Sequence, residues 1–344
     1  MVLFVTQPND ATALAVADIL RAGGTEVLLF ETQKFPLESS LSLHFRGGAE
    51  RLRLKTPSFE TDFAAVKSVW YRVAVAPDVA SHLSPVDADF ARRESTQAVR
   101  SLWHLLRDRF WVNDWPSMVT ADYKPYQLRV AREVGLEIPR TLISNDPSDV
   151  RSFSKSCGNG MIYKTLTTYQ LMHFTPDRQH FIFTNIVTPE ELDRRCEDIA
   201  LAPGIFQEYL HKRMEYRVTV VGKQLFTAEI DSQGDESSRI DWRRAINSTA
   251  MPQRASHLPP EIESKVLAFM ERLGLAFGCI DLLLTDDGRY VFLEVNPTGQ
   301  WYWLQERTGM PIAENVASML DQADPWYRRV AASADRAVAS AVPQ

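Results

Sequence analysis

Three oxygen-bearing side chains in the last quarter of the chain are spaced so that they could hold a divalent cation. Asp281 lies in one apolar run, and Glu294 and Asn296 lie in a second run that follows Asp287-Gly288. An Asp-Gly pair between apolar runs is typical of a two-residue type I′ hairpin turn. Such a turn pairs 286 with 289 and puts Asp281 directly opposite Glu294. Because side chains alternate along a strand, Glu294 and Asn296 share a face.

Two facing carboxylates would destabilise a buried hairpin, because like charges directly opposite repel each other and burial strengthens the repulsion. Carboxylate and amide oxygens are ligands that Mg²⁺ takes alongside nucleotide phosphates. We therefore predict a magnesium site formed by Asp281, Glu294 and Asn296. The alternative is a solvent-facing strand with alternating charges, which the depletion of Asp and Glu from such apolar strands disfavours.

Two lysines stand where they could bind phosphate. Lys124 lies near the N-terminus of a helix expected over 121–135, and Lys164 ends a strand expected over 160–164. A lysine ammonium binds phosphate as a point charge. Taken singly, each would be an ordinary surface lysine, so their interpretation depends on the pattern of the whole chain.

The first third of the chain predicts a parallel α/β region, because strand, helix and strand follow one another. Asp10 is expected to cap its first helix and Gly23-Gly24 to end it. The turn after the first strand lacks the GxGxxG pattern of dinucleotide-binding proteins. The expected elements are a strand over 2–6, a helix over 13–22, strands over 26–30 and 68–71, a helix over 87–109, and a strand and turn over 111–116.

The remainder of the chain is predicted to mix helices with antiparallel strands. Thr188-Pro189 with Glu191 is the signature of a capped helix start. The expected elements are strands over 140–144, 160–164 and 204–210, a long hairpin over 171–187, strands within 216–231, a helix over 259–274 and the hairpin over 278–297. The Ala- and Ser-rich end, over 332–344, is expected to be a frayed helix or tail.

Composition restricts the class of protein. The 344 residues carry a formal net charge of −6, so no basic surface for nucleic acid is expected. The isolated Cys157, Cys196 and Cys279 indicate neither a disulfide framework nor structural zinc. No apolar stretch reaches the roughly 18 residues of a membrane span. We expect a soluble, cytoplasmic protein that contacts neither nucleic acid nor membrane.

Taken together, these features resemble the ATP-grasp ligases in order and spacing over about the last two thirds of the chain. The resemblance is closer still to the graspetide maturases, the ligases that cyclise microviridin-type peptides. It is carried by Trp70-Tyr71-Arg72, by Lys124 before Gln127-Leu128-Arg129, by Pro139-Arg140-Thr141-Leu142 with Asn145-Asp146-Pro147, by Gln207-Glu208-Tyr209-Leu210, by Glu215-x-Arg217, and by the run from Glu294 to Trp301.

The resemblance implies an α/β chain, α+β in its second half, with the ATP-grasp fold. A pre-ATP-grasp domain would span 1–115 and the ATP-grasp domain 116–330. The latter would comprise a lysine-bearing lid over about 116–205, a hinge over 207–210 and a metal-bearing part over about 211–330, with a tail over 331–344.

The resemblance also implies roles for individual residues. Lys124 and Lys164 would hold ATP phosphates; Gln207, Glu208, Tyr209 and Leu210 would meet adenine; Glu215 would bind the ribose hydroxyls; Asp281, Glu294 and Asn296 would ligate Mg²⁺; and Arg217 with Arg243 would steer the substrate carboxylate or acyl phosphate. Arg239 is the alternative to Arg243. The planar guanidinium suits such groups because its fork matches a carboxylate or phosphoryl group.

The function implied is that of an ADP-forming carboxylate–amine or carboxylate–alcohol ligase that uses ATP and Mg²⁺. It would phosphorylate Asp or Glu side chains of a ribosomally made precursor peptide, with a leader and a core. Thr, Ser or Lys side chains would then form ω-esters or ω-amides. A homodimer is expected. Two alternatives stay open: a ligase that adds a free amino acid to a peptide or small carboxylate, and a non-catalytic ATP-binding module, which the intact metal ligands and both lysines disfavour.

The predicted hairpin over 171–187 offers a surface for the leader peptide. Its apolar side chains are Phe174, Phe181, Phe183 and Ile186. We expect a leader segment to dock beside it and beside the helix opened by Thr188-Pro189. The alternative is that these side chains pack against the enzyme's own core or a dimer partner.

Two segments depart from the family pattern. Thr165-Leu166-Thr167 follows Lys164, where many ATP-grasp enzymes have a glycine-rich loop, and Val73-Ala74 follows Arg72, where a second arginine and a proline are expected. The role of the first domain is therefore left unassigned. No histidine or other residue is singled out as a general base.

Overall fold

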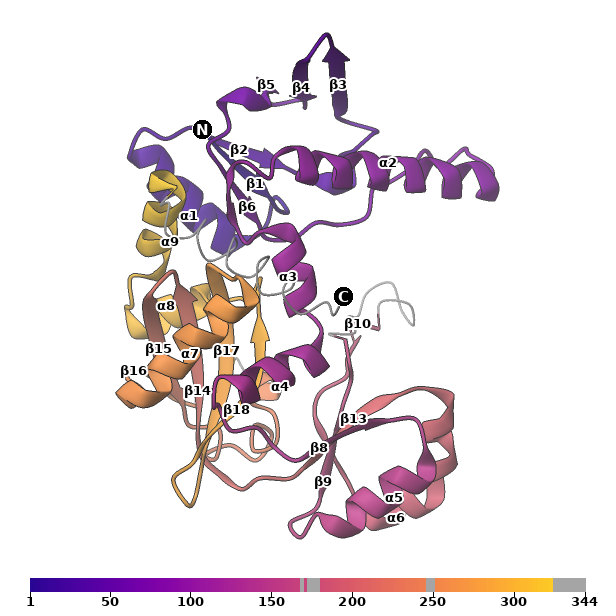
Figure 1. Ribbon diagram of the computed structural model, residues 1–344, viewed down its shortest axis with the longest axis vertical. Helices are drawn as coiled ribbons and strands as arrows, with labels where there is room; N and C mark the ends of the chain where they lie inside the picture. The colour runs from indigo at the N-terminus through magenta and orange to yellow at the C-terminus, as the bar shows by residue number, and fades with distance from the viewer. Residues whose placement is uncertain (168–169, 172–179, 246–250, 324–344) are drawn as a thin grey trace, which may run out of the picture.

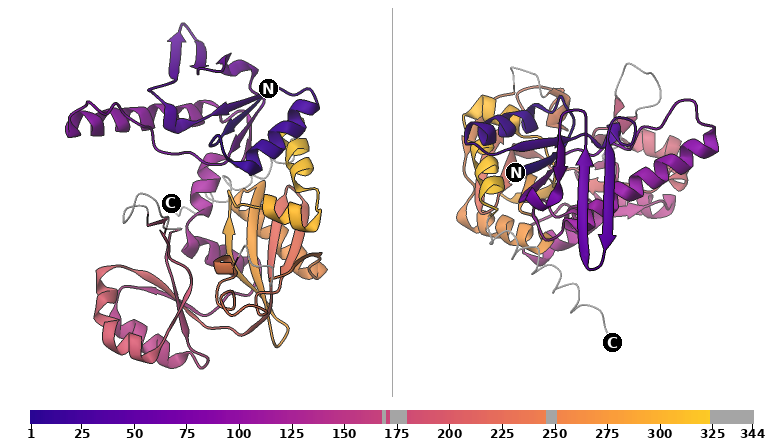
Figure 2. Two further views of the ribbon diagram at one scale, coloured as in Figure 1. Left: turned by 180° about the vertical axis from the view of Figure 1, so that it is seen from behind. Right: turned by 90° about the horizontal axis from the view of Figure 1, so that it is seen from above.

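The computed structural model describes residues 1–167, 170–171, 180–245 and 251–323 (Figure 1). Three sheets carry most of the fold, and two smaller sheets accompany them. Figures 1 and 2 show an N-terminal region above, a body built on the largest sheet, and a smaller sheet with its helices standing to one side.

The N-terminal region contains the predicted parallel sheet, in the order β2-β1-β6-β7. Its strands and first helix are β1 (Val2–Val5), α1 (Ala11–Ala22), β2 (Val27–Phe30), β6 (Ser68–Tyr71) and β7 (Phe110–Val112). Every residue of β1 is buried. The predicted cap is confirmed, because the Asp10 carboxylate accepts a hydrogen bond from Ala13 N, and Gly23 ends α1.

The sequence analysis missed a small antiparallel sheet in this region, in the order β3-β4-β5. In β4, buried Leu52 and Leu54 alternate with exposed arginines, so period-2 alternation was the signal that could have found it. The remaining elements here are η1 (Thr32–Lys34), β3 (Ser40–Arg46), β4 (Ala49–Lys55), β5 (Glu60–Asp62), η2 (Phe63–Ala65) and α2 (Pro85–Leu105). Helix α2 begins two residues before the predicted 87 because Ser84 caps it.

The helix predicted over 121–135 is two helices, α3 (Trp115–Ala121) and α4 (Lys124–Glu133). Asp114 caps α3, and α3 ends at the Asp122 C-cap. Pro125 stands in the first turn of α4, where its missing N–H costs nothing. The break places Lys124 at the first position of a helix rather than inside one.

A four-stranded sheet, in the order β12-β9-β13-β8, forms the part that we call the lid. Its pairs are antiparallel. Helices α5 and α6 pack on one face through Val150, Leu192 and Phe206. The predicted capping box at Thr188 and Glu191 is confirmed. The elements are β8 (Thr141–Ser144), α5 (Pro147–Ser156), β9 (Met161–Lys164), β12 (Asn185–Val187), α6 (Pro189–Arg195), η3 (Cys196–Leu201) and β13 (Gly204–Glu208).

The hairpin predicted over 171–187 differs in one respect. β10 (Gln170–Leu171) pairs with β11 (His180–Phe181), as a hairpin would. Its second strand is interrupted, however, because the chain leaves the pairing after Phe181 and joins the lid sheet as β12. Phe174 and the turn over 175–178 lie outside the described residues, as does the tail from 324 onward.

The body is a five-stranded antiparallel sheet in the order β16-β15-β14-β17-β18. Helix α7 covers it through a core that includes Phe269, Ile280 and Phe292. The predicted helix over 259–274 and the predicted strands are confirmed; α8, α9 and β16 were not predicted. The elements are β14 (Lys212–Val221), β15 (Gln224–Ile230), η4 (Trp242–Ala245), β16 (Gln253–Ser256), α7 (Pro260–Leu273), β17 (Phe277–Thr285), β18 (Tyr290–Asn296), α8 (Tyr302–Thr308) and α9 (Ile312–Gln322).

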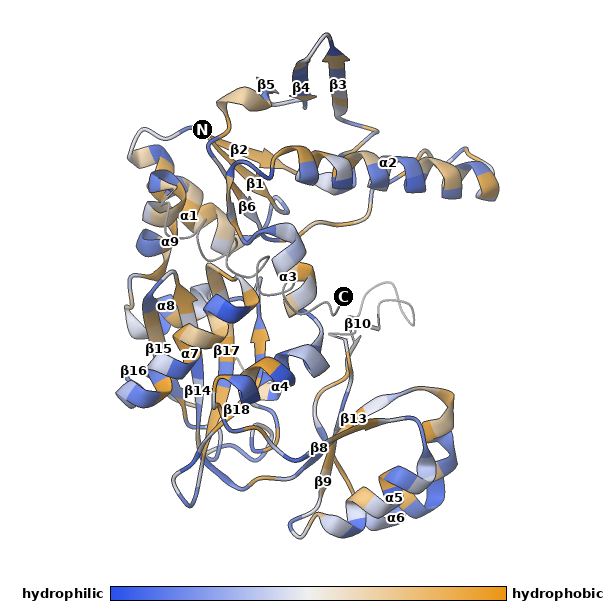
Figure 3. Ribbon diagram, viewed as in Figure 1, coloured by the Kyte–Doolittle hydropathy of each residue, from blue (hydrophilic) through white to orange (hydrophobic). Residues whose placement is uncertain are grey.

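One hydrophobic core joins the N-terminal region to the body. It contains Phe4 of β1 and Val16 of α1 together with Phe277 of β17 and Val316 of α9. Helices α1 and α9 lie side by side (Figures 1 and 2). Figure 3 shows hydrophobic residues concentrated on the inner strands, whereas the outer faces of α5 and α6 are largely hydrophilic.

The hairpin of β17 and β18 pairs Asp281 with Glu294, as predicted. The predicted two-residue turn is wrong. Thr285 N donates to Arg289 O and Gly288 N donates to Thr285 O, each at 3.0 Å, so residues 286–288 form a three-residue loop. Gly288 takes the left-handed conformation (φ 88°) that ends such a loop.

A bulge compensates for the longer turn. Beside the loop the pairing is shifted by one residue, so that Leu282 faces Phe292. Leu293 is the extra residue, and beyond it Asp281 faces Glu294 in the predicted register. Bulges re-aim side chains and occur preferentially next to active sites.

Within the described residues, none of the helices combines the length and the apolar character that crossing a membrane requires.

Candidate active site

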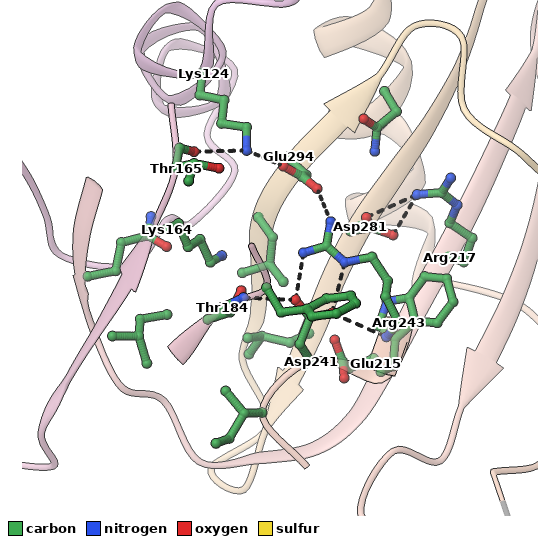
Figure 4. Close-up of a pocket in the computed structure, with 18 of the residues that line it drawn as sticks. Lys124, Lys164, Thr165, Thr184, Glu215, Arg217, Asp241, Arg243, Asp281 and Glu294 are labelled. Carbon is green, nitrogen blue, oxygen red and sulfur yellow. Dashed lines mark hydrogen bonds and ion pairs between the residues drawn. The ribbon is translucent and has the colours of Figure 1, made fainter. Parts of the chain in front are cut away.

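A cavity of about 640 Å³ lies between the lid and the body (Figure 4). Every site residue predicted from the sequence lines it. These residues come from α4, from β9, β13 and the segment that follows β13, and from β14, η4, β17 and β18 of the body. They are Lys124, Lys164, Gln207, Glu208, Tyr209, Leu210, Glu215, Arg217, Arg243, Asp281, Glu294 and Asn296.

Cationic side chains of the chain itself surround the paired carboxylates. Arg217 Nη1 lies 2.9 and 3.0 Å from the two oxygens of Asp281. Glu294 lies between Lys124 Nζ, 3.2 Å from its Oε2, and Arg243 Nη1, 3.4 Å from its Oε1. The repulsion between the two carboxylates is thus relieved by three cationic groups.

The two carboxylates titrate differently. Burial opposes ionisation of Glu294, but the charges of Lys124, Arg243 and Lys164 outweigh it and lower the pKa of Glu294 to about 2. Burial raises the pKa of Asp281 above its usual range, opposed by Arg217 and reinforced by the charge of Glu294. Additional positive charge beside Asp281 would favour its ionised form.

The donor set fits a hard divalent cation. Glu294 and Asn296 lie two residues apart on β18, opposite Asp281 and Cys279 of β17. In the described part of the chain, no three His, Cys, Asp or Glu side chains are grouped closely enough to hold a metal ion. A third protein ligand beside the two carboxylates would therefore be the Asn296 amide, whose oxygen is a suitable donor for Mg²⁺.

The two lysines approach the carboxylates from different elements. Lys124, the first residue of α4, also donates to Thr165 O of the lid at 3.2 Å. Lys164, the last residue of β9, points into the cavity (Figure 4). Burial lowers the pKa of Lys164, an effect that the charge of Glu294 opposes. An anionic ligand beside this ammonium would raise its pKa again.

The segment 207–210 is held by hydrogen bonds that leave its last residue available. Gln207 Nε2 donates to Thr141 Oγ1 at 2.9 Å, and Glu208 Oε1 accepts from Arg140 N at 2.9 Å. Glu208 N and Tyr209 N donate to Arg140 O and Gly160 O. Among the described residues, Leu210 N has no backbone hydrogen-bond partner, so it can donate to a ligand.

Glu215, on β14, is buried and ion-paired. Lys212 Nζ lies 2.7 Å from its Oε1 and also donates to Ile240 O at 3.1 Å. Burial raises the pKa of Glu215, and Lys212 opposes the rise. Lys212 was not predicted, although its position three residues before Glu215 on an apolar strand was a signal.

Asp241 is the most important residue that the sequence analysis missed. Its carboxylate, 3% exposed, accepts hydrogen bonds from Arg243 Nε (2.8 Å) and Nη2 (2.6 Å), and from Thr184 N of the lid at 3.1 Å. It therefore fixes the guanidinium plane of Arg243 and ties that arginine to the lid. Arg239 is exposed and does not line the cavity.

Burial opposes ionisation of Asp241, but the hydrogen bonds and charge of Arg243 outweigh it and hold the pKa of Asp241 well below its usual range. Beside this pair, Trp242 packs on Trp303 with ring centroids 5.2 Å apart. Trp303, on α8, also lines the cavity. An apolar wall thus stands next to the arginine.

The fold and its structural relatives place the chain among the ATP-dependent ligases of the ATP-grasp class. The family model described as the MvdD pre-ATP-grasp domain matches residues 1–118. A search of curated proteins found no match.

Solved structures that are similar over nearly the whole chain include the following three. An ATP-grasp ligase from Chryseobacterium gregarium, associated with ribosomally synthesised and post-translationally modified peptides (RiPPs), was solved with ADP and a leader and core peptide. It is 26% identical with a TM-score of 0.84, covering 94% of this chain and 97% of that one.

The macrocyclase MdnC from Microcystis aeruginosa, bound with precursor peptide MdnA, is 30% identical (TM-score 0.80; 93% and 99% covered). The macrocyclase MdnB from the same organism is 32% identical (TM-score 0.78; 93% and 98% covered). The chain therefore belongs to the family of RiPP ATP-grasp ligases, and the predicted pre-ATP-grasp and ATP-grasp folds are confirmed.

Proposed function

We propose that this enzyme is a peptide macrocyclase. It joins Asp or Glu side chains of a ribosomally made precursor peptide to Thr, Ser or Lys side chains as ω-esters or ω-amides. The observation that carries the proposal is the cavity in which Lys124, Arg243 and Arg217 surround the Asp281–Glu294 pair. Its support is the similarity of 93% of the chain to two macrocyclases.

The reaction has two steps. A peptide carboxylate takes the γ-phosphoryl group of ATP, and ADP leaves. A hydroxyl or amine of the same peptide then attacks the carbonyl carbon, loses its proton and displaces phosphate. Magnesium, held by Asp281, Glu294 and Asn296, would supply charge neutralisation for the transferred phosphoryl group.

Groups of the chain itself bind the nucleotide and the peptide. Lys124 and Lys164 bind phosphate oxygens. Leu210 N donates to adenine, and Glu215 binds the ribose. Arg243, oriented by Asp241, and Arg217, oriented by Asp281, hold the peptide carboxylate and its phosphorylated form, where negative charge develops. The general base that takes the proton of the hydroxyl or amine is left unassigned.

A leader peptide binds the lid beside β12 and α6. Ile186 is 38% exposed there, and Ile182 is 39% exposed. Ile182 and Phe183 also line the cavity, so the segment between β11 and β12 adjoins both surfaces. The side chains of Phe174 and Phe181 lie outside the described residues and Phe183 lines the cavity, so this proposal rests on Ile186. The homodimer and the domain boundaries at 115, 205 and 330 stay predictions.

Mass spectrometry separates the proposed function from its alternatives. The purified enzyme is incubated with ATP, Mg²⁺ and a precursor encoded by a neighbouring short reading frame rich in Thr and Asp or Glu. Macrocyclisation removes one water per ring. Addition of a free amino acid would instead raise the peptide mass, and a non-catalytic module would leave it unchanged; either result would contradict the proposal.

A further inference from the structure

The loop over 298–300 lines the cavity and is held between two buried arginines. From the body, Arg217 Nη2 donates to Gln300 O at 3.1 Å, while its Nη1 holds Asp281. From the N-terminal region, Arg72 Nη1 donates to Thr298 O at 3.0 Å and to Gly299 O at 3.2 Å. The loop thus connects the first domain to a residue of the candidate active site.

Arg72 is itself rigidly placed. It follows β6 directly, and its N–H donates to Val5 O of β1 at 2.9 Å. Its side chain is fully buried, and Nε lies 3.2 Å from Oδ2 of Asp10, the residue that caps α1. The guanidinium also lies over the Trp70 ring, 5.4 Å from its centroid. Strand, helix cap and aromatic ring together restrict its position.

The loop packs so closely on the active-site arginine that a shift of one would move the other. A Cβ added at Gly299 would stand 2.5 Å from Cys279 Cβ and 2.9 Å from Arg217 Nη2. A second contact from the first domain reaches the same loop, because Thr12 Oγ1 donates to Gln300 Oε1 at 2.7 Å. Close packing of this kind transmits small displacements.

We propose that Arg72 is a positioning residue for the ligase reaction, an inference that rests on the function proposed above. It fixes the 298–300 loop, and the loop fixes Arg217 against Asp281 for the peptide carboxylate. A buried ion pair is weak evidence for stability, because apolar residues of similar volume often serve as well. A planar guanidinium that bonds Asp10 through Nε and two successive carbonyl groups through Nη1 has a use that apolar packing cannot supply.

Two variants and one control test the proposal. Arg72→Lys keeps the charge but loses the planar guanidinium group. Thr12→Val removes only the hydroxyl that contacts Gln300. The control, Asp321→Asn, removes the charge of Asp321 and so weakens its contacts with Lys67 and Thr25, which join the same two regions away from the loop. For each we would measure kcat, KM for the precursor, affinity for a non-hydrolysable ATP analogue, melting temperature and amide exchange over 298–300.

In Arg72→Lys we expect kcat/KM for the precursor to fall about 10- to 100-fold, as small misplacements of catalytic groups do. Affinity for the nucleotide analogue should be unchanged, and amide exchange over 298–300 should accelerate. Thr12→Val should show the same pattern to a smaller extent. Asp321→Asn should match the wild type in turnover and in exchange over the loop.

The proposal is overturned if folded Arg72→Lys keeps wild-type kcat and KM, or if only its melting temperature falls. If the wild type converts no precursor, the proposed function is wrong. Amide exchange over 298–300 then still tests whether Arg72 fixes the loop. Unchanged exchange over 298–300 would then overturn its positioning role, and faster exchange in Arg72→Lys but not in Asp321→Asn would support it.

Discussion

Three cationic side chains, Lys124, Arg243 and Lys164, stabilise the charge of the Glu294 carboxylate. Glu294→Gln keeps the shape but removes the charge, so we expect turnover to fall about 100-fold or more, as loss of a major electrostatic group does. The matched control is Asp286→Asn, an exposed carboxylate in the loop of the same hairpin. Near wild-type kcat for Glu294→Gln at saturating Mg²⁺ would show that the metal assignment is wrong.

The two cations on opposite walls of the cavity are expected to act on different ligands. Lys164, from the lid, should bind the nucleotide phosphates, whereas Arg217, bound to Asp281, should bind the peptide carboxylate. Lys164→Ala should therefore weaken binding of a non-hydrolysable ATP analogue first, and Arg217→Ala should reduce turnover more than nucleotide affinity. Titration calorimetry measures the affinities, and equal losses in both variants would contradict this division.

The Asp241–Arg243 pair predicts a definite pH dependence of stability. Because the pKa of Asp241 is held below its usual range in the folded enzyme, the pair stabilises the fold above the ordinary Asp pKa, near 3.9, and loses its contribution as the pH falls below it. Denaturation midpoints of wild type and Asp241→Asn should differ by a constant amount between neutral pH and about pH 5, then converge in acid. A difference that grows as the pH falls would contradict this sign.

At the scale of elements, local rules predicted the hairpin that carries the metal ligands but not its details. Apolar runs on both sides of an Asp-Gly pair were sufficient to predict the pairing of Asp281 with Glu294. They could not reveal a three-residue loop compensated by a bulge at Leu293, because a bulge depends on contacts across the sheet. The register at the site was right because the two deviations cancel.

The lid makes a second prediction at this scale. If the leader peptide binds beside β12 and α6, Ile186→Ser should weaken leader affinity without changing affinity for the ATP analogue. Leu201→Ser is the matched control, because Leu201 is another apolar lid residue and is 84% exposed. Fluorescence anisotropy with a labelled leader measures the effect. Equal leader affinity in folded Ile186→Ser and wild type would show that the leader does not bind at this surface.

At the scale of the molecule, the predictable part of the site was the part with a fixed spacing along the chain. The hairpin ligands were predicted from residue type and spacing, and Lys124, Lys164, Glu215 and Arg217 from the resemblance to the ATP-grasp ligases. Asp241 was missed because its role depends on contacts with Arg243 and a backbone N–H of the lid. The role of the first domain could not be predicted, because Arg72 contacts Thr298 across 226 residues of sequence.

If this enzyme couples ATP cleavage to closure of peptide rings, ADP formation and ring formation must have a fixed stoichiometry. Wild-type enzyme, ATP, Mg²⁺ and precursor are mixed, and ADP formed is compared with water lost from the peptide by intact-mass analysis. Each ring requires one phosphoryl transfer, so we predict one ADP formed for each water lost from the peptide. Glu294→Gln should neither form ADP nor close rings at a significant rate. ADP formation without loss of water, or with a gain in peptide mass, would show that the enzyme does not close peptide rings.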